Sequence, residues 1–369
     1  MLVNDEVRGK RWDLSMVWTM VALVVIGTFN LYAATYSGTP SAESNYWKTQ
    51  MYWFLIGCGA ILLLFFVNYR IMERFTYLVY AFNLLALILV LVVGRTVLGS
   101  KRWLVLGPLT IQPSEFMKIT IAWTLAKYFH DEQRKDVYGL RDLIVPILLV
   151  IVPVLLVMRQ PDLGTALVIL AVSGTLLLFI RIDPKLLIAL AIGFAVLLPV
   201  AYKFALKDYQ RQRIVTFLNP QSDPRGAGYN SIQSMIAVGS GKFLGKGFKK
   251  GTQSQLKFLP EHHTDFIFSV FSEEWGFLGS IVLLGLYVTL MVNGMRIAYS
   301  ANDKFGMLFS LGLISIFFWH VFINMGMTMG IMPVVGVPLP FLSYGGSSLV
   351  AGMVAVGIMT NIANKKSMF

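Results

Sequence analysis

One short string in this 369-residue sequence could carry proton-transfer chemistry, namely Glu261-His262-His263-Thr264-Asp265. Asp265 stands directly before an apolar run that begins with Phe266 and Ile267. An apolar neighbourhood disfavours a charged carboxylate, which raises its pKa and makes it a better general base. An Asp at this position could equally cap the helix that follows. Zinc is a weaker hypothesis, since adjacent histidines rarely face one ion and no third nitrogen or sulfur ligand lies nearby.

A second candidate pair, Glu115 and Lys118, lies in an apolar stretch that opens with Pro113. Proline suits the first position of a helix, and the helix dipole stabilises an acidic residue in the first turn. Residues three apart share one face of a helix, so the two side chains can meet. The pair either neutralises itself inside a helix bundle, or Lys118 reaches a phosphate or a catalytic carboxylate.

Asp162 is the third candidate, because it follows Pro161 and precedes Leu163 at the start of another apolar run. A carboxylate at this position has an ordinary structural role as a helix cap. It could instead pair with Lys118 or Arg159 in the interior of a bundle. Both interpretations place Asp162 at or near the beginning of a helix.

A cluster of lysines stands among glycines between residues 239 and 257. Glycine backbone and ammonium groups together suit a diphosphate or an anionic lipid head group, although a solvated basic loop is the simpler alternative. The cluster is not a P-loop, because neither Gly-Lys pair is followed by Ser or Thr at the required position. The lysines are Lys242, Lys246, Lys249, Lys250 and Lys257.

The elements that position these residues must be membrane helices. Hydrophobic residues make up 56% of the chain and charged residues only 14%, whereas about 25% of a soluble protein is charged. The composition therefore predicts a polytopic membrane protein. The net charge of +12 fits basic helix ends that meet anionic lipid, and no nucleic-acid partner is expected. The single cysteine, Cys58, cannot form an intrachain disulfide.

Ten segments are long and apolar enough to cross a bilayer, which needs about 20 mostly apolar residues. The predicted fold is thus an all-α integral membrane protein, a single domain over residues 1–369. Glu273 and Glu274 fall inside the eighth span, and we expect at least one of them to be satisfied within the bundle. The spans cover about 14–36, 49–68, 75–94, 113–130, 142–158, 162–181, 184–203, 266–294, 304–329 and 343–363.

The loop charges predict the orientation. With the N-terminus inside, fifteen Lys and Arg residues lie in cytoplasmic segments and five in the short outer loops, so both termini are expected in the cytoplasm. Residues 204–265 then form one large extracytoplasmic loop between the seventh and eighth spans. Asn230 to Val238 is apolar with helical spacing and could lie as a helix at the membrane interface. A loop of this length is usually functional.

Several strings occur together in the order typical of one family. They resemble the SEDS family (shape, elongation, division and sporulation) from about residue 95 to 350, and two of them, Tyr209–Arg213 and Gly251–Gln255, are closer to its RodA branch than to its FtsW branch. The pair His262-His263 departs from the pattern, since many relatives carry a single His. The strings are Arg102–Leu104, Gln112–Glu115 with Lys118, Gln160–Thr165, Tyr209–Arg213, Gly251–Gln255, Leu259–Phe268, Pro333–Pro340 and Ser343–Ser347.

This resemblance implies a peptidoglycan glycosyltransferase of the bacterial cytoplasmic (inner) membrane. Such an enzyme polymerises lipid II during cell-wall elongation and rod-shape maintenance, beside a class B penicillin-binding protein that crosslinks the product. The family's essential carboxylate corresponds to Asp265. Its intramembrane charged group corresponds to Glu115, Lys118 and Asp162.

The chemistry agrees with that assignment. A sugar hydroxyl must lose a proton, whereas a polyprenyl diphosphate is already a good leaving group. One carboxylate therefore suffices, unlike the two required for glycoside hydrolysis. Asp265 is the candidate base, and no cofactor is required unless a divalent cation joins the diphosphate. A cationic clamp on the diphosphate is a large catalytic term, and its candidate residues are Arg102, Arg211, Arg213 and Lys242.

Two other functions compete with the enzyme. A lipid II flippase or transporter would also need many spans and buried charges, but it would place them near the midplane. Asp265 and the basic loop are instead predicted on the outer side. A silent scaffold that only recruits cell-wall enzymes would not depend on Asp265.

Overall fold

The computed structural model describes residues 13–36, 45–97, 100–107, 109–132, 137–186, 208–223, 226–255, 259 and 261–365, with single positions between 188 and 203. The long helices are α1 (Ser15–Ala34), α2 (Tyr46–Phe66), α3 (Tyr69–Val93), α4 (Pro113–Asp131), α5 (Ile144–Arg159), α6 (Leu163–Leu178), α11 (Ile267–Tyr299), α12 (Lys304–Thr328) and α13 (Gly346–Lys365). These nine helices coincide with nine of the ten predicted spans. The remaining predicted span, 184–203, lies mostly outside the described residues.

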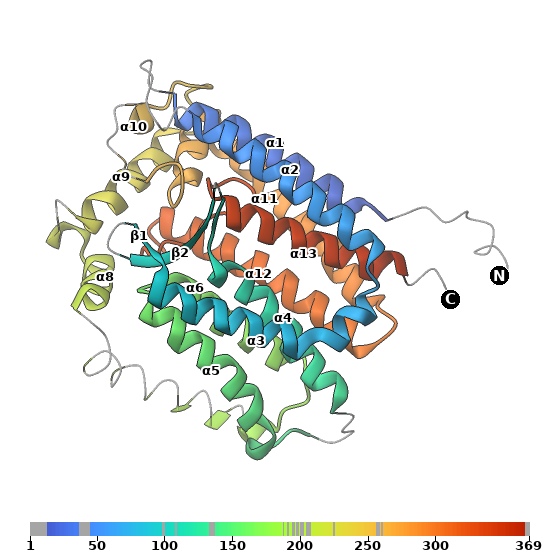
Figure 1. The fold of residues 1–369 in the computed structure, drawn as a ribbon. Helices are drawn as coiled ribbons and strands as arrows, with labels where there is room; N and C mark the ends of the chain where they lie inside the picture. Colours follow the sequence, from blue (N-terminus) through green and yellow to red (C-terminus); the bar gives the residue numbers. More distant parts are fainter. Residues whose placement is uncertain are drawn as a thin grey trace.

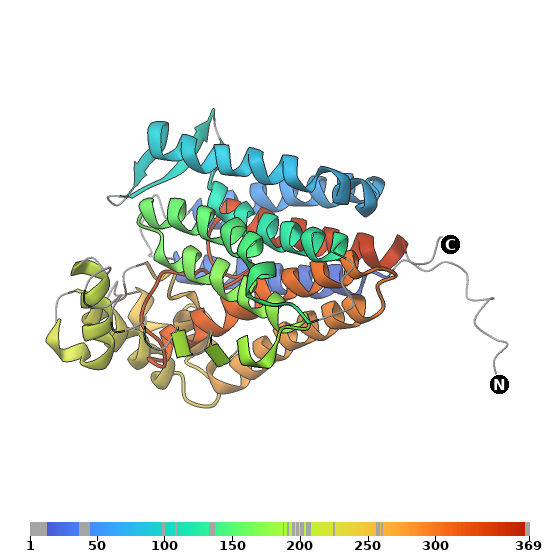
Figure 2. The same ribbon diagram turned by 90° about the horizontal axis from the view of Figure 1, so that it is seen from below.

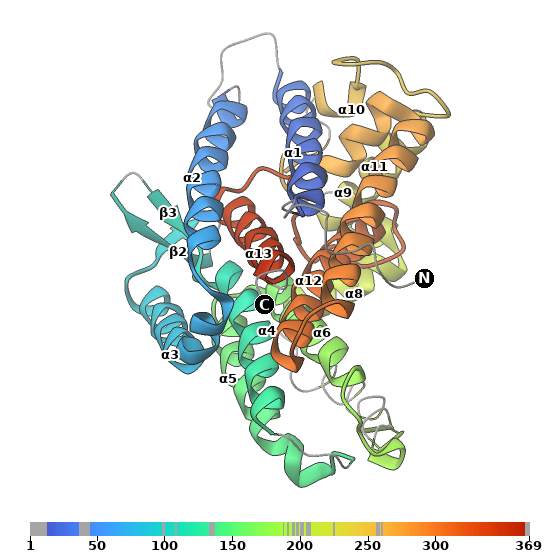
Figure 3. The ribbon, with the colours of Figure 1, turned by 90° about the vertical axis from the view of Figure 1, so that its right-hand side faces the viewer.

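The core of the molecule is a bundle with α12 near its axis. Helix α12 packs against α4, α6 and α11, and α13 packs against α2; Figure 3 looks along the bundle and shows α12 and α13 surrounded by the other helices. Seven helices in the described ranges are long and apolar enough to cross a membrane. The predicted class, a polytopic membrane protein, is confirmed.

The two ends of the bundle differ. Helices α8 (Asp208–Leu218), α9 (Ala227–Ser240) and α10 (Thr252–Gln255) lie together at one end, which we call the loop end (Figure 1). The start of α1 and the end of α13 lie at the opposite end. Both terminal helices therefore open on the same side, as predicted, while the compartment on that side stays a prediction.

A small sheet at the loop end was not predicted and is added to the all-α membrane fold. Strands β1 (Arg95–Val97), β2 (Ser100–Leu106) and β3 (Leu109–Ile111) form an antiparallel sheet in the order β1-β2-β3, where the sequence was expected to form only a short loop. Figure 2 shows it at the same end of the bundle as α8 and α9. Strand β2 packs on α3 and α4, and β3 on α13. The sheet thereby sets the entry to α4, which begins at Pro113 two residues after β3.

Helix α11 is not one straight span, which corrects the predicted helix over 266–294. Its backbone leaves the helical conformation at Gly276, where φ is 65°. In a continuous helix, residues eight apart lie about 12 Å apart along the axis. The hydroxyls of Ser272 and Ser280 are nevertheless only 3.1 Å apart. The chain therefore folds back sharply at a point that we call the Gly276 corner.

The described part of the long connection before α11 contains several helices. Besides α8, α9 and α10 it contains a short 3-10 helix, η3 (Pro220–Ser222). The helix predicted at Asn230–Val238 is confirmed as α9, which packs on α11 and α12. Ser234 of α9 shares a 2.7 Å hydrogen bond with Ser269 and donates to the carbonyl of Thr328. Helix α9 is thus fixed to the bundle, and α8 and α10 pack on α9; we call these three helices the cover.

Candidate functional site

Asp265 lies at the loop end, in the turn that leads into α11. The helix cap is Phe266, without a side-chain hydrogen bond, so the alternative in which Asp265 caps α11 is wrong. Its backbone carbonyl accepts from Asn324 Nδ2 at 3.0 Å. A Cβ added to Gly336 would lie 3.3 Å from Asp265 Oδ2, so the carboxylate rests on the backbone of the 333–340 segment. Within the described ranges, no hydrogen bond to that carboxylate is formed.

Four charged groups surround the Asp265 carboxylate. Burial is the largest effect and raises its pKa, and the negative charge of Glu261 raises it further. The guanidinium groups of Arg213, on α8, and Arg102, on β2, lower it, while the charge of Asp162 raises it and is the smallest of these effects. The pKa that results is about 6. A carboxylate with this pKa is charged at neutral pH and is a stronger base than an ordinary Asp.

Asp162 occupies a different environment. It caps α6, where it accepts from the backbone N–H of Thr165. Its Oδ2 also accepts from Thr165 Oγ1 at 2.9 Å, from Gln112 Nε2 at 3.1 Å and from Ser114 Oγ at 3.4 Å. The helix-cap interpretation is therefore confirmed, and the buried carboxylate is saturated with donors.

Arg102 joins the sheet to the start of α6. Its guanidinium lies 3.9 Å from Asp162 Oδ1 and donates to the carbonyls of Gln160 and Pro161. Asp162 was predicted to pair with Lys118 or Arg159. It pairs with Arg102 instead. About a third of the Arg102 side chain stays exposed.

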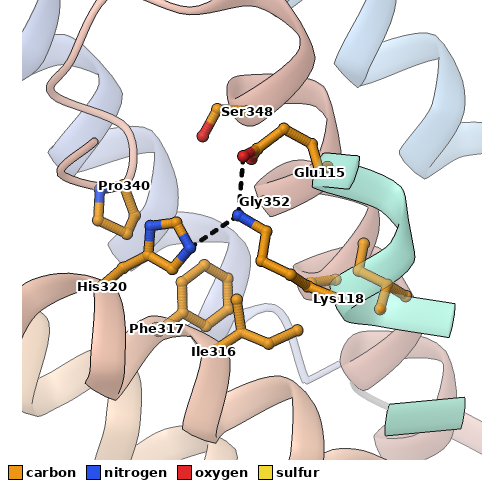
Figure 4. A pocket seen from close by; sticks show the side chains of 11 residues that line it. Glu115, Lys118, Ile316, Phe317, His320, Pro340, Ser348 and Gly352 are labelled. Carbon is orange, nitrogen blue, oxygen red and sulfur yellow. Dashed lines mark hydrogen bonds and ion pairs between the residues drawn. The ribbon is translucent and has the colours of Figure 1, made fainter. Parts of the chain in front are cut away.

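Glu115 and Lys118 form the predicted ion pair, with Lys118 Nζ 2.9 Å from Glu115 Oε1. Both side chains are buried. Lys118 Nζ also lies 2.8 Å from Nε2 of His320 on α12, and Figure 4 shows the three side chains converging beside Pro340 and Ser348. Lys118 thus reaches a histidine rather than Asp162. The predicted network consists of two clusters, which adjoin through the first turn of α4, where Ser114 and Glu115 are neighbours.

The basic loop has a structural role at the Gly276 corner. The carboxylate of Glu273 is fully buried and accepts from Lys246 Nζ at 2.6 Å and from Thr252 N at 2.8 Å, which confirms that a glutamate of this span is satisfied. Lys249 Nζ lies 4.1 Å from the ring centre of Tyr32, a cation–π contact. Lys246 thus binds a carboxylate of the corner, and Lys249 binds a ring of α1.

Of the four residues predicted to contact the diphosphate, two act on Asp265 and two have other contacts. Arg102 and Arg213 lie close enough to Asp265 for their charges to act on it. Lys242 is exposed, and its carbonyl accepts from Phe277 N beyond the Gly276 corner. Arg211 Nη2 donates to the carbonyl of Lys203.

Two residues of this site were not predicted, His320 and Asn324. Both are buried polar residues of α12, and an isolated polar side chain inside a long apolar run was the available indication. No group of three His, Cys, Asp or Glu side chains in the described part of the chain is placed to hold a metal ion.

The fold and the site define a polytopic membrane protein with a desolvated carboxylate at one end, within reach of the charges of two guanidinium groups. The family model for FtsW, RodA and SpoVE, described as a cell cycle protein, matches residues 13–368. The chain belongs to this family, and the resemblance to the SEDS proteins is confirmed.

Individual proteins agree over the same length. The peptidoglycan glycosyltransferase MrdB of Escherichia coli K12 is 39% identical over 363 residues, which covers 96% of this chain and 94% of that protein. A chain of a peptidoglycan synthase complex that coordinates polymerization and crosslinking has a TM-score of 0.83 at 32% identity, covering 97% of this chain and 99% of that one. The rod shape determining protein RodA of Thermus thermophilus has a TM-score of 0.72 at 29% identity, covering 97% and 98%.

Proposed function

We propose that this chain is a peptidoglycan glycosyltransferase of cell-wall elongation, which polymerises lipid II into glycan strands and releases polyprenyl diphosphate. The observation that carries the proposal is the contrast between the two aspartates of the site. Asp162 is saturated with hydrogen bonds, whereas Asp265 is desolvated and lies within reach of the charges of Arg102 and Arg213. Paired groups whose environments differ in this way take different roles.

Asp265 acts as the general base in this mechanism. It takes the proton from a hydroxyl of the acceptor sugar, whose oxygen attacks the anomeric carbon of the donor. The bond between that carbon and the diphosphate oxygen breaks, and polyprenyl diphosphate leaves with the electron pair. Arg102 and Arg213 neutralise the charge that develops on the diphosphate. A divalent cation bound with the diphosphate would add to the same effect.

An apolar cavity of about 930 Å³ suits the polyprenyl chain. It is lined by α3, α4, α13 and the sheet, and it reaches Leu104 and Pro113. Leu104 stands two residues after Arg102 on β2, and Pro113 precedes Ser114, which contacts Asp162. A lipid held there would have its head group at the loop end, beside the charged groups.

The setting of the reaction is part of the proposal. We place the loop end on the outer face of the bacterial cytoplasmic membrane, with both termini in the cytoplasm. A class B penicillin-binding protein would crosslink the strands as they form. Similarity to a chain of a peptidoglycan synthase complex supports this partnership.

Substitution of Asp265 by Asn tests the base. Asn keeps the size of the side chain but cannot accept the proton, so polymerisation of lipid II by purified, folded protein should fall by about 10²–10⁴-fold. Glycan strands are measured by gel electrophoresis after a fixed incubation with lipid II. A matched control is Glu261→Gln, which changes an exposed carboxylate in the same turn and should leave the rate near that of the wild type.

Near wild-type polymerisation by folded Asp265→Asn protein would rule out the base. If the wild type makes no strands but moves lipid II across vesicles, the chain is a flippase instead.

A further inference from the structure

The 333–340 segment packs against Asp265 and has no regular structure. Its Gly336 has a φ of 77°, in the left-handed region that favours glycine. A side chain at Gly336 would press on the Asp265 carboxylate, since its Cβ would lie 3.3 Å from Oδ2. The buried backbone carbonyls of an irregular segment need hydrogen-bond donors from the groups around it. The donors to this segment therefore help to hold it in its position relative to Asp265.

His320 binds this segment from α12. Its Nδ1 lies 2.9 Å from the carbonyl oxygen of Pro338, which can only accept a hydrogen bond. Its Nε2 lies 2.8 Å from Lys118 Nζ, which can only donate. Nδ1 must therefore carry the proton and Nε2 must carry the lone pair, so the imidazole is neutral with a fixed tautomer.

Asn324 binds the same segment one helical turn further along α12. Its Nδ2 donates to the carbonyl of Val337 at 2.7 Å and to the carbonyl of Asp265 at 3.0 Å. A single buried amide thus ties the backbone of the base to the residue that follows Gly336. His320 and Asn324 lie four positions apart, so they occupy one face of the helix.

We infer that His320 and Asn324 are positioning residues, which together hold the 333–340 segment and Asp265 in the geometry that the reaction needs. Lys118 acts through His320, because its ammonium group fixes the tautomer that donates to Pro338. Glu115 in turn compensates the charge of Lys118. The inference rests on the proposed role of Asp265 as the base, and it gives the buried ion pair a function in the site without contact with substrate.

Two variants of His320 separate its two hydrogen bonds. The amide of Asn in His320→Asn can reproduce the Nδ1 donor toward Pro338, whereas the carbonyl of Gln in His320→Gln can reproduce the Nε2 acceptor for Lys118. We expect His320→Asn to keep kcat for lipid II polymerisation within about fivefold of the wild type, the scale of one neutral hydrogen bond. His320→Gln should lower kcat by about 10²-fold with little change in KM, because the 333–340 segment would shift relative to Asp265.

The reverse order of these two variants would overturn the inference, because it would show that only the partner of Lys118 matters. Polymerisation by the wild type reports on the proposed function itself. The ratio between the two variants reports on positioning.

Asn324 has a matched control at the other end of the bundle. Asn361 of α13 donates in the same way to two carbonyls, those of Leu64 and Val67, at 2.6 Å and 2.7 Å. Asn324→Leu and Asn361→Leu therefore each lose two hydrogen bonds and should lower the melting temperature by similar amounts. Only Asn324→Leu should lower kcat per folded molecule, by about 10²-fold. Equal losses of kcat in both variants would contradict a positioning role.

The tautomer can be observed without any assay of activity. The chain contains four histidines, so ¹⁵N-histidine labelling and comparison with His320→Asn assign the ring nitrogens of His320. We expect a protonated Nδ1 and an unprotonated Nε2 at neutral pH, and loss of this fixed pattern in Lys118→Met. An imidazolium, or the opposite tautomer, would overturn the inference even if Asp265 proved to be the base.

Discussion

At the residue scale, the site places two carboxylates of one chemical type in opposite surroundings. Asp162 receives hydrogen bonds from Gln112, Ser114 and Thr165, and these donors occupy the lone pairs of its carboxylate. Asp265 lies among protein atoms that give it none, so its charged form is less stabilised than that of an ordinary Asp and its pKa is raised to about 6. A base must be able to accept a proton, and only Asp265 is prepared for that.

The pH dependence of polymerisation should report this difference. Asp265 must be unprotonated to act, and its pKa is about 6, so the rate should fall as the pH drops below about 6. Arg213→Gln removes a charge that lowers the pKa and should move the midpoint to higher pH. Glu261→Gln should move it to lower pH, because Glu261 raises the pKa. The measurement is kcat/KM for lipid II between pH 4.5 and 8.

A thermal control follows from linkage. Because its folded-state pKa is raised, Asp265 costs stability above pH 6, and the cost disappears below about pH 4, where the carboxyl is protonated in both states. Asp265→Asn should therefore melt higher than the wild type at pH 8 and equally at pH 4.

The pH–rate experiment has its own contradicting outcome. If neither Arg213→Gln nor Glu261→Gln moved the midpoint of the rate, the titrating group would be one other than Asp265.

At the scale of single elements, the Gly276 corner shows how a loop completes a helix. The backbone of Lys246 and Gly247 donates to the carbonyls of Glu273 and Glu274, and Phe277 donates to the carbonyl of Lys242. Loop residues thus satisfy groups that a straight helix would satisfy internally. The corner fixes the direction of the first two turns of α11, which begin directly after Asp265.

Gly276→Ala tests the corner. The φ of 65° disfavours any other residue, and a Cβ would lie 2.3 Å from the backbone nitrogen of Gly245, so the loop and the helix must separate. We expect a lower melting temperature and a lower polymerisation rate. Gly285→Ala is the control, because a Cβ there meets nothing within 4 Å and alanine favours a helix by about 0.5–1 kcal/mol. Equal behaviour of the two variants would mean that the corner has no role.

The sequence predicted those parts of the site whose residues are costly wherever they lie. Asp162, Asp265 and the pair Glu115–Lys118 were identified because charge in an apolar run needs a partner or a function. His320 was missed because its partners, Lys118 and Pro338, are set by helix packing. The separation of 202 positions between His320 and Lys118 carries no periodicity that a sequence pattern could show.

The fold was predicted to a similar depth. Spans follow from length and hydropathy, and nine of them coincide with helices in the described residues. The Gly276 corner was missed because the apolar run continues through it and a single glycine is tolerated within a helix. The sheet at residues 95–111 was missed because its strands are short and carry charged residues such as Lys101.

At the scale of the whole molecule, everything that the proposed reaction needs lies at one end of the bundle. The sheet, α8 and the turn before α11 contribute Arg102, Arg213 and Asp265. The cover formed by α8 to α10 lies at this end (Figure 1). An enzyme that acts on a head group at the membrane surface requires this polarity, whereas a transporter would centre its charges.

Topology reporters test the orientation of this end. Fifteen short-loop cations on one side against five on the other predict a cytoplasmic C-terminus and an outer loop end. A phosphatase fusion in η3 should be active and a C-terminal one inactive, with the opposite result for a fluorescent protein that folds only in the cytoplasm. Activity of both phosphatase fusions would exclude the proposed orientation.

The prolines of the 333–340 segment have a consequence for its composition. Pro333, Pro338 and Pro340 carry no N–H group, so an irregular chain packed among membrane helices has fewer donors to satisfy. The groups of this segment that still need partners are therefore mainly carbonyls, and neighbouring helices supply the donors. Tyr287 donates to the carbonyl of Pro340, and His320 donates to the carbonyl of Pro338. Any other residue at these positions would add an N–H group that needs an acceptor, whereas the neighbouring side chains of Tyr287 and His320 are donors. The segment is thus an acceptor-rich strip, and its place in the bundle depends on donors that belong to other helices.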